Sequence, residues 1–240
     1  SDIYNINTSN GEAITVDPET YYLLSKAIEI CEETDGAIDI TVADLMDLWG
    51  FNSSESINSL PNDSDIKDLL THVDYRNIIL LEDNKVMLKD PESHIDLGFI
   101  AKGYIADKLK EHLLASGVEK AIISLGGNIY VIGQKDENTD FAIGVKDPSK
   151  KTDILTKLYV HDTSVVTSGT YERYIEVDGQ KYHHILDTKT GYPVNNGIEG
   201  VTIICESSMY ADALSTTCLI LGEENSKDLL NKYNAEAMFY

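Results

Sequence analysis

The sequence has few cations for its length, and this shortage excludes whole classes of partner. Its 240 residues include 19 lysines and arginines against 41 aspartates and glutamates, a formal net charge of −22 at pH 7. Such a surface repels nucleic acids and anionic membranes, so we expect neither as a partner. The charge also disfavours an anionic ligand unless a cation screens it, which favours a metal ion in any phosphate chemistry. A soluble acidic surface is the simpler explanation of the charge itself.

Cysteine is scarce as well. The chain has three, Cys31, Cys205 and Cys218, and no two of them stand at C-x-x-C spacing. An odd number of widely spaced thiols is typical neither of a disulfide framework nor of a thiolate zinc site. We therefore expect three buried, unreactive thiols.

Long apolar runs are absent too. No stretch approaches the roughly 20 apolar residues that span a bilayer, and the chain does not open like a signal peptide. Because Ser1-Asp2-Ile3 reads as the interior of a longer sequence, we expect that a segment before it has been removed. Hydrophobic residues make up 42% and charged residues 25% of the chain, ordinary proportions for a soluble globular protein.

What the sequence does contain is an alternation of short strands and helices. Asp17-Pro18-Glu19 is a good helix start, and Asp83-Asn84 and Asp178-Gly179 mark the turns of two hairpins. The predicted helices are 18–34, 65–72, 100–117, a segment about Asp212 that stops at Gly222, and 225–233. The predicted strands are 77–81, 85–88, 121–125, 129–133, 141–145, 155–160, 164–167, 174–177, 181–185, 200–205 and 237–240. Antiparallel pairs with interspersed helices predict an α+β fold rather than a doubly wound sheet.

We predict one domain over residues 1–240. Residues 1–16 are polar and predict loop and short turns. Residues 52–64 are rich in serine and asparagine and form the strongest break in the pattern. We interpret them as a surface excursion within the domain rather than as a boundary.

A first candidate site lies in the predicted helix 211–217. Asp212 and Thr216 stand four residues apart and share a helix face. Two hard oxygen atoms on one face suggest a Mg²⁺ or Ca²⁺ site that serves phosphate chemistry. On spacing alone, a capping or solvated aspartate is the favoured interpretation.

The paired histidines form a second candidate. His183 and His184 end a predicted strand, so alternation points them to opposite faces and only one can reach a given site. A lone strand histidine is usually structural, but turn formers follow this pair, which favours function.

Three further patterns are weaker. The segment 98–103 could present backbone N–H groups to phosphate, but it matches neither the Walker pattern nor G-x-G-x-x-G. Gly126-Gly127-Asn128 is either a simple bulge or a point of close backbone approach. Ser168 lacks a G-x-S-x-G elbow, which argues against a serine hydrolase.

Six motifs, in order along nearly the whole chain, carry a resemblance to a known family. They are 36–42 with Leu48-Trp49-Gly50-Phe51, 96–104, Leu125-Gly126-Gly127-Asn128, 168–173, 183–187 with Thr190-Gly191-Tyr192-Pro193, and 211–216. Together they resemble the ApbE-type FAD:protein FMN transferases, also called flavin-trafficking proteins. The resemblance implies a single α+β domain of the ApbE type, related to the T-fold, with antiparallel sheets and packed helices.

The resemblance also implies a site. It implies that the Asp212 carboxylate, the Thr216 hydroxyl and the Ala101 backbone carbonyl bind a metal ion, Mg²⁺ or else Ca²⁺. It further implies residues that lie along the FAD; these are Ala37, Ile38, Asp39, Gly98, Lys102, Tyr104, His184 and Ile185.

The implied reaction is covalent flavinylation. In this family a Thr or Ser hydroxyl of a second protein attacks the FMN-side phosphorus of FAD, and AMP leaves. A metal ion stabilises the negative charge that builds on the phosphate oxygens, which makes Asp212 a catalytic residue. We expect His184, directly before the Ile-Leu-Asp of its motif, to be the general base, with His183 as the fallback. If water replaces the hydroxyl, the same site would hydrolyse FAD.

The resemblance extends to partners and place. It implies an acceptor protein that is a subunit of a redox complex, and a lipoprotein that works outside the cytoplasmic membrane through a lipid anchor missing here. Family chains begin further upstream and continue beyond Tyr240, so we expect both ends to be truncated, which bears on the flavin pocket. Two departures are Phe99, in place of a small residue, and Thr188, in place of a common proline. The alternatives are a metal-dependent FAD pyrophosphatase and a non-catalytic flavin-binding lipoprotein.

Overall fold

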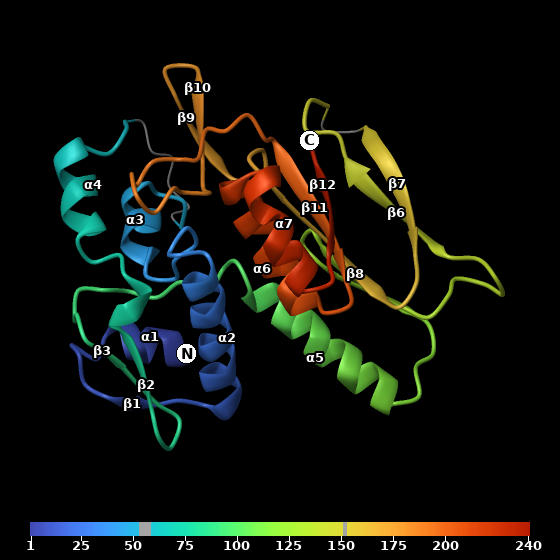
Figure 1. Ribbon diagram of the computed structural model, residues 1–240, viewed down its shortest axis with the longest axis horizontal. Coiled ribbons are helices and arrows are strands. Elements are labelled where there is room, and N and C mark those ends of the chain that lie inside the picture. The colour runs from blue at the N-terminus through green and yellow to red at the C-terminus, as the bar shows by residue number, and fades with distance from the viewer. Residues whose placement is uncertain (53–58, 151–152) are drawn as a thin grey trace. The chain divides into compact units, whose positions relative to one another are not determined.

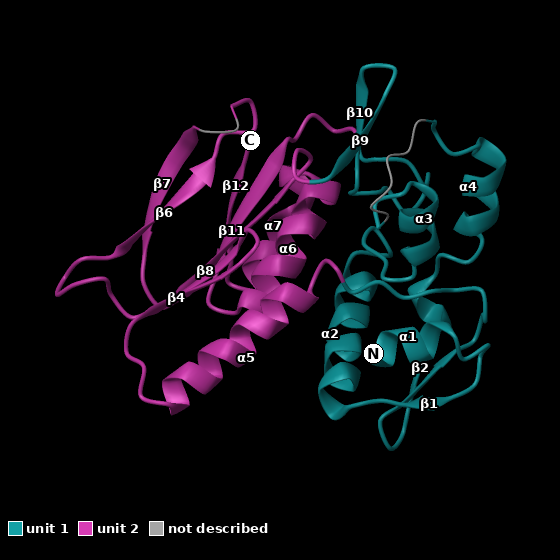
Figure 2. Ribbon diagram, turned by 180° about the vertical axis from the view of Figure 1, so that it is seen from behind, with its two compact units in different colours: residues 1–97, 173–194 teal, residues 98–172, 195–240 magenta. Residues whose placement is uncertain are grey.

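The computed structural model describes residues 1–52, 59–150 and 153–240. These residues form two compact units (Figure 1; Figure 2). Unit 1 contains residues 1–97 and 173–194, and unit 2 contains residues 98–172 and 195–240. Helices and antiparallel sheets occur in both units, which confirms the α+β class. The prediction of one domain over residues 1–240 stays a prediction, and residues 53–58 of the predicted excursion 52–64 lie outside the described residues.

Unit 1 combines short helices with two small antiparallel sheets. Its helices are α1 Asp2–Asn7, α2 Pro18–Glu33, α3 Ala43–Leu48, α4 Asp63–Leu70 and the 3₁₀ helix η1 Tyr75–Asn77. Its strands are β1 Ile14–Thr15, β2 Ile78–Leu81, β3 Lys85–Leu88, β9 Tyr174–Val177 and β10 Gln180–His183. The first sheet has the order β1-β3-β2, and β9 pairs with β10.

Two local sequence signals in unit 1, a helix start and a turn, are found in the structure where they were predicted. The Asp17 side chain accepts a hydrogen bond from the Glu19 N–H at 2.8 Å and caps α2, whose first residue is Pro18. Asp83 and Asn84 adopt φ of 58° and 53°, as the tight turn of a β2–β3 hairpin requires.

The prediction of loop over residues 1–16 was wrong. Residues 2–7 form α1, which Ser1 caps by accepting a hydrogen bond from the Tyr4 N–H at 3.4 Å. Ile6 is fully buried and supplies the packing that so short a helix needs. The strand predicted to reach residue 185 is also shorter: β10 ends at His183, so His184 follows the strand.

Trp49 fastens the 190–193 turn of unit 1 to its core. The indole is fully buried, stacks on Phe51 with ring centres 6.0 Å apart, and donates a hydrogen bond to the Gly191 carbonyl at 2.8 Å. Gly191 has a φ of +72°, and a Cβ there would lie 2.5 Å from Cγ2 of Ile66. Only glycine adopts this positive φ and leaves room for Ile66 without strain. The motif that contains Trp49 and the motif that contains Gly191 thus pack in one core.

Unit 2 is built on a five-stranded antiparallel sheet of order β12-β11-β8-β5-β4. Its strands are β4 Ala121–Leu125, β5 Asn128–Ile132, β8 Thr163–Gly169, β11 Gly200–Cys205 and β12 Glu236–Phe239. The helices are α5 Ala101–Ala115, α6 Ser208–Leu221 and α7 Glu223–Lys232. A separate ribbon pairs β6 Phe141–Lys146 with β7 Ile154–Val160.

The pleat of the sheet separates two hydrophobic layers. Tyr130 and Ile132 of β5 cluster with Ala106 of α5. Val131 lies between them in sequence but packs instead with Ile143 and other residues of the β6–β7 ribbon. Successive side chains point to opposite faces of a strand, so α5 and the ribbon lie on opposite faces of the sheet. Figure 1 shows the helices of unit 2 along one face of that sheet.

Helices α5 and α6 touch at Gly103. A Cβ at this position would lie 2.1 Å from the Ser208 carbonyl oxygen and 2.7 Å from both the Asp212 Cβ and the Met209 Cα. Each helix also caps the other. The Asp212 carboxylate of α6 accepts a hydrogen bond from the Gly103 N–H at 2.8 Å, and Asp107 of α5 accepts from the Ser208 and Met209 N–H groups, both at 2.9 Å. The caps satisfy backbone donors that a helix start leaves without partners.

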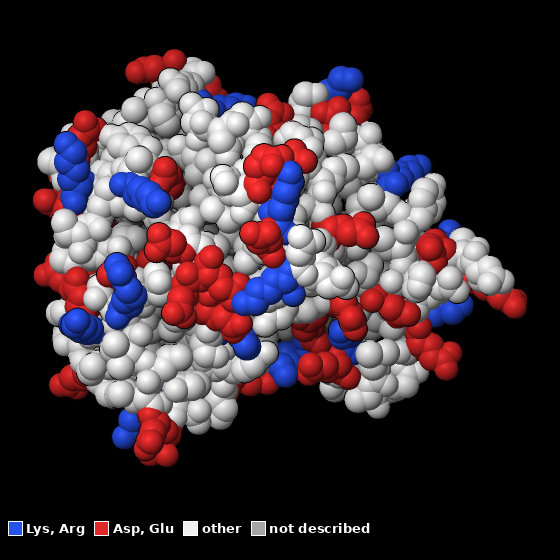
Figure 3. Space-filling model, in the orientation of Figure 1, with Lys and Arg blue, Asp and Glu red and all other residues white. Residues whose placement is uncertain are grey.

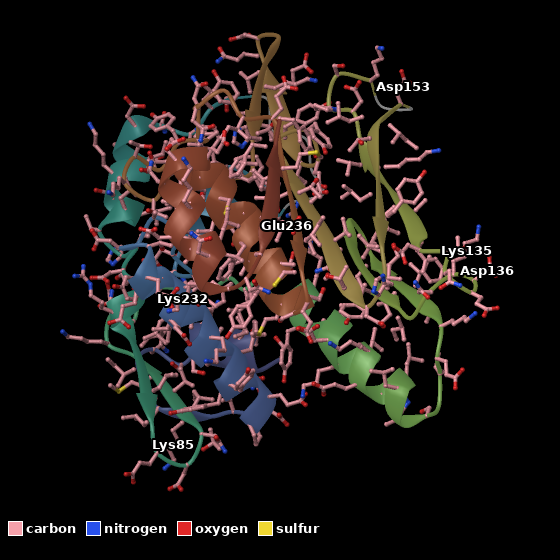
Figure 4. The ribbon with its side chains drawn as sticks, turned by 45° about the vertical axis from the view of Figure 1, so that its right-hand side comes forward. Lys85, Lys135, Asp136, Asp153, Lys232 and Glu236 are labelled. Atoms are coloured by element: carbon pink, nitrogen blue, oxygen red, sulfur yellow. The ribbon has the colours of Figure 1, made fainter. Side chains whose placement is uncertain are left out.

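The surface carries the charge and the interior holds the thiols. Acidic side chains are spread over the face shown in Figure 3, with fewer basic ones among them. Lys85, Asp136 and Glu236, which are labelled in Figure 4, are exposed, and the side chains of Lys85 and Asp136 point away from the ribbon there. All three cysteines are buried and free, as predicted. None of the helices in the described ranges is long and apolar enough to cross a membrane.

Replacing Gly103 by alanine is expected to destabilise the protein by about 3 kcal/mol, near the upper end of the overpacking range. Alanine favours helices intrinsically, so a loss of this size must come from the contact with α6. Gly144→Ala is the control, because the atoms nearest its Cβ would belong to the flexible Ile154 side chain, at 3.1 Å and beyond. Urea denaturation of both variants measures the difference. Equal stability of the two variants would mean that α5 and α6 separate without loss.

Candidate functional site

Asp212 lies buried in the middle of α6, with 2% of its surface exposed. Its Oδ2 accepts the hydrogen bond from Gly103, and its Oδ1 lies 3.4 Å from Nζ of Lys102. The interpretation of Asp212 as a solvated aspartate is therefore wrong. Asp212 does act as a cap, but of α5 rather than of its own helix α6, and its second oxygen pairs with the Lys102 ammonium group.

The environment of Asp212 works against its charge. Burial raises the pKa of this carboxyl, while Lys102, the Gly103 N–H and the Asn128 amide lower it. Burial is the largest of these effects, because water no longer solvates the ionised form. A carboxylate held in this way attracts further positive charge.

Asn128 stands beside this carboxylate and was not assigned to the site from the sequence. It is fully buried, and its Oδ1 accepts a hydrogen bond from the Ser208 hydroxyl at 2.7 Å. Its amide acts on the Asp212 carboxylate, although Nδ2 completes no hydrogen bond of ordinary geometry with any described residue. The signal was present in the Leu125-Gly126-Gly127-Asn128 motif, whose glycines make the β4–β5 turn at φ of 55° and 94°.

The three predicted metal ligands all lie in unit 2. Ala101 is the first residue of α5, and Asp212 and Thr216 lie in α6, which is helical there as predicted. Within the described part of the chain, no group of three His, Cys, Asp or Glu side chains gathers around a possible metal position. The three predicted donors are a carboxylate, a hydroxyl and a carbonyl, hard oxygen atoms of the kind that Mg²⁺ and Ca²⁺ prefer, and their role as metal ligands stays a prediction.

Among the described residues, the hydrogen-bond partners of the Ser168 side chain are hydroxyl groups, not a base. Its Oγ is 2.7 Å from Oγ of Ser215 and 3.0 Å from Oγ1 of Thr216. These hydroxyls hold it in a network within unit 2, which agrees with the argument against a serine hydrolase.

The paired histidines His183 and His184, which both lie in unit 1, differ in the hydrogen bonds that their rings make. His183 donates from Nε2 to the Val194 carbonyl at 2.8 Å and accepts at Nδ1 from the Ile185 N–H at 3.3 Å. Both ring nitrogens thus bond the backbone, and burial lowers the pKa of His183, which keeps the ring neutral. His184 donates from Nδ1 to the Arg173 carbonyl at 3.1 Å. In the neutral ring of His184 the basic nitrogen is then Nε2.

Asp39, predicted to lie along the FAD, organises its own loop. Its carboxylate accepts hydrogen bonds from the Thr41 N–H and hydroxyl at 2.8 and 2.7 Å, and from the Tyr75 N–H at 2.8 Å. Burial raises the pKa of Asp39, and these donors oppose the shift. The bonds hold the segment that contains Ala37 and Ile38, and the FAD contacts of all three residues stay a prediction.

Thr188, which departs from the family pattern, makes a bond that proline could not. Its hydroxyl donates to the Gly36 carbonyl at 2.6 Å. This bond ties the turn after His184 to the turn before Ala37, both in unit 1. Two segments that are far apart in sequence, and that each contain predicted FAD contacts, are thus linked directly.

The remaining predicted FAD contacts lie in both units. Ile185 is buried in unit 1, where its carbonyl accepts a hydrogen bond from the Val194 N–H at 3.0 Å. In unit 2, Gly98 is exposed just before α5, and the Lys102 side chain is 45% exposed. Tyr104 lies in the same turn of α5, with its ring 5.6 Å from Nζ of Lys108. The start of α5 thus places an ammonium group and backbone N–H groups together.

Comparison with known proteins gives one consistent result. The model of the ApbE family matches residues 1–239. A FAD:protein FMN transferase of Treponema pallidum is 34% identical over 253 residues, covering 98% of this chain and 69% of that protein. One of Klebsiella pneumoniae is 36% identical over 245 residues, covering 100% and 74%.

Solved structures agree. The ApbE protein of Thermotoga maritima superposes with a TM-score of 0.91 at 37% identity, covering 100% of this chain and 78% of that one. The flavin transferase ApbE of Vibrio cholerae superposes with a TM-score of 0.85 at 29% identity, covering 98% and 75%.

The raised pKa of Asp212 predicts a pH-dependent stability. Since folding raises this pKa above its ordinary value of 3.8, the carboxyl contributes stability below that pH and loses it as pH rises through the folded pKa. Asp212→Asn keeps an oxygen acceptor for Gly103 but carries no charge. Its stability relative to wild type is therefore expected to increase as pH rises from about 4 to 7.

Urea unfolding in the presence of a chelator measures this difference at each pH. Asp153→Asn, at an exposed position, is the control for loss of one negative charge. A stability difference between Asp212→Asn and wild type that stays constant over the range would contradict the assignment of burial as the main cause.

Proposed function

The chain belongs to the ApbE family and is a flavin transferase, and we propose that it moves FMN from FAD to a Thr or Ser hydroxyl of an acceptor protein, releases AMP and depends on a divalent cation. The observation that carries the cation dependence is the buried Asp212 carboxylate, which lies at the N-terminus of α5 beside Lys102. A helix N-terminus and a lysine attract phosphate, but a carboxylate repels it. A pyrophosphate bound there needs additional positive charge.

The donor set fits such a cation. The ammonium group of Lys102 lies 3.4 Å from Oδ1 of Asp212, so this oxygen already interacts with a positive charge. We assign the cation to the Asp212 carboxylate, the Thr216 hydroxyl and the Ala101 carbonyl, with Mg²⁺ favoured over Ca²⁺. When bound, it would stabilise the negative charge that develops on the phosphate oxygens.

The bond changes define what the side chains must do. The acceptor oxygen forms a bond to the FMN-side phosphorus, the bond from that phosphorus to the bridging oxygen breaks, and AMP leaves. The acceptor hydroxyl gives up its proton, which a base must receive. We assign this base to Nε2 of His184. The hydrogen bond to the Arg173 carbonyl places the hydrogen of the neutral ring on Nδ1, so the lone pair that can accept a proton is on Nε2.

FAD itself is assigned to the residues named in its family motifs. Lys102 supplies charge for the pyrophosphate, and Gly98 and Tyr104 flank it in sequence. Ala37, Ile38, Asp39, His184 and Ile185 complete the assignment, with Asp39 also holding its own loop.

The acceptor and the location are proposals as well. We propose that the acceptor is a subunit of a redox complex and that the full protein is a lipoprotein outside the cytoplasmic membrane. Both rest on the family resemblance alone.

His184→Asn is expected to lower kcat for FMN transfer at least about a hundredfold, the lower limit of typical general-base effects, with little change in the KM for FAD. An asparagine amide can still donate to the Arg173 carbonyl, so the variant removes the base while it keeps that bond. His161→Asn, at an exposed position, is the control. A kcat near that of wild type would exclude His184 as the base.

A single assay separates the candidate functions. The protein is incubated with FAD, Mg²⁺ and an acceptor protein that carries a target threonine. Flavin fluorescence on denatured acceptor is the result expected; free FMN and AMP without labelling would indicate a pyrophosphatase instead, and intact FAD would indicate a binding protein.

The Asp212→Ala variant tests the cation in the same assay. We expect it to lose metal-dependent turnover, because it lacks the only carboxylate among the assigned ligands. Full activity in this variant would contradict the assignment of Asp212 as a metal ligand.

A further inference from the structure

Three hydroxyl groups form a connected chain in unit 2. Ser168 projects from β8, and Ser215 and Thr216 are neighbours on α6. The Ser168 Oγ lies 2.7 Å from the Ser215 Oγ and 3.0 Å from the Thr216 Oγ1, and the Ser215 Oγ lies 2.8 Å from the Asp212 carbonyl oxygen. Ser215 is fully buried, and Ser168 and Thr216 are half-buried.

The carbonyl oxygen of Asp212, at which this series of hydroxyl groups ends, determines the direction of each hydroxyl hydrogen. A carbonyl oxygen can only accept, so the Ser215 hydroxyl donates its single hydrogen to Asp212. Ser215 must then accept from Ser168, which uses the single hydrogen of Ser168. Ser168 in turn can only accept from Thr216. The hydrogen of Thr216 therefore points at Ser168, and both lone pairs of its oxygen point elsewhere.

The neighbouring Thr217 shows what a helical threonine does otherwise. Its hydroxyl donates to the Ala213 carbonyl, four residues earlier, at 2.8 Å. This back-bond is the usual choice for Thr in a helix. Thr216 instead has a hydroxyl partner on a strand of the sheet.

We propose that Ser168 and Ser215 are positioning residues for the cation site: together they hold the hydroxyl hydrogen of Thr216 away from the cation, so that a lone pair of Oγ1 faces it. The inference rests on the proposed function, since it presumes a cation at Thr216. A neutral hydroxyl binds a cation only through a lone pair, so its hydrogen needs an acceptor elsewhere. Ser168 supplies that acceptor only because Ser215 takes the hydrogen of Ser168.

The test measures the affinity for Mn²⁺ alone, in the absence of FAD, from the electron paramagnetic resonance signal of the free ion. Ser168→Ala removes the acceptor, and Ser215→Ala allows Ser168 to turn its hydrogen toward Thr216. Each is expected to weaken Mn²⁺ binding about tenfold, the lower limit for residues that orient a metal ligand. Because both act through one chain of bonds, the double variant is also expected to lose about tenfold rather than about a hundredfold.

Matched controls separate this role from a structural one. Thr217→Val removes a buried hydroxyl from the same helix, and Thr167→Val removes one from the same strand, where it bonds Thr202 at 2.7 Å on the other face. Both are expected to bind Mn²⁺ as wild type does. Ser168→Thr keeps the hydroxyl and should retain the affinity. Thermal unfolding with chelator present checks that each variant is folded.

Three results would overturn the inference, and they differ from one another. Wild-type affinity in both Ser168→Ala and Ser215→Ala would remove the positioning role and leave the cation site standing. A loss of about a hundredfold in the double variant would mean two independent effects rather than one chain. No Mn²⁺ binding by the wild-type protein would overturn the cation assignment of the proposed function together with this inference.

Discussion

The contact of α5 with α6 at Gly103 is the constraint on which the rest of unit 2 depends. The two helices approach so closely that no Cβ fits between them, and each supplies a carboxylate that caps the other. These hydrogen bonds satisfy backbone donors within a buried contact, where an unpaired N–H would be strongly destabilising. The same contact fixes the position of Asp212 relative to the start of α5. The candidate site is thus a consequence of how two helices pack.

This arrangement joins stability and function in one side chain. Asp212 caps α5, which stabilises the fold, yet burial raises its pKa, so the ionised carboxylate disfavours folding at neutral pH. Lys102 offsets part of that charge, and a divalent cation would offset more. Other polar side chains surround this carboxylate and the Thr216 hydroxyl. Asn128 lies beside the carboxylate, and the Ser168–Ser215 pair orients Thr216.

Unit 1 organises its candidate residues by different means. Trp49 and Gly191 hold the 190–193 turn on a hydrophobic core, while Asp39 ties its own loop to η1. Thr188 then connects the turn after His184 to Gly36. The backbone carbonyl of Arg173 selects the tautomer of His184. The bonds of Trp49, Asp39 and Thr188 join segments between 36 and 152 residues apart. The bonds of Asp39 and His184 directly constrain residues assigned to FAD or to catalysis.

The sequence by itself determined what depends on nearby residues. Helix α2 follows from its Asp17-Pro18 start, the β2–β3 turn from Asp83-Asn84, and the family from six motifs in order, because caps, turns and periodicity act over a few residues. Helix α1 was missed because the burial of Ile6 comes from tertiary packing. Only the tertiary structure decided that Asp212 caps α5, that His183 bonds the backbone through both nitrogens, and that Ser168 lies against Thr216. Asp212 and Gly103 are 109 residues apart, and Ser168 and Thr216 are 48 apart. Local propensity carries no information over such separations, because only the packing of helix on helix and helix on sheet brings these groups within hydrogen-bond distance.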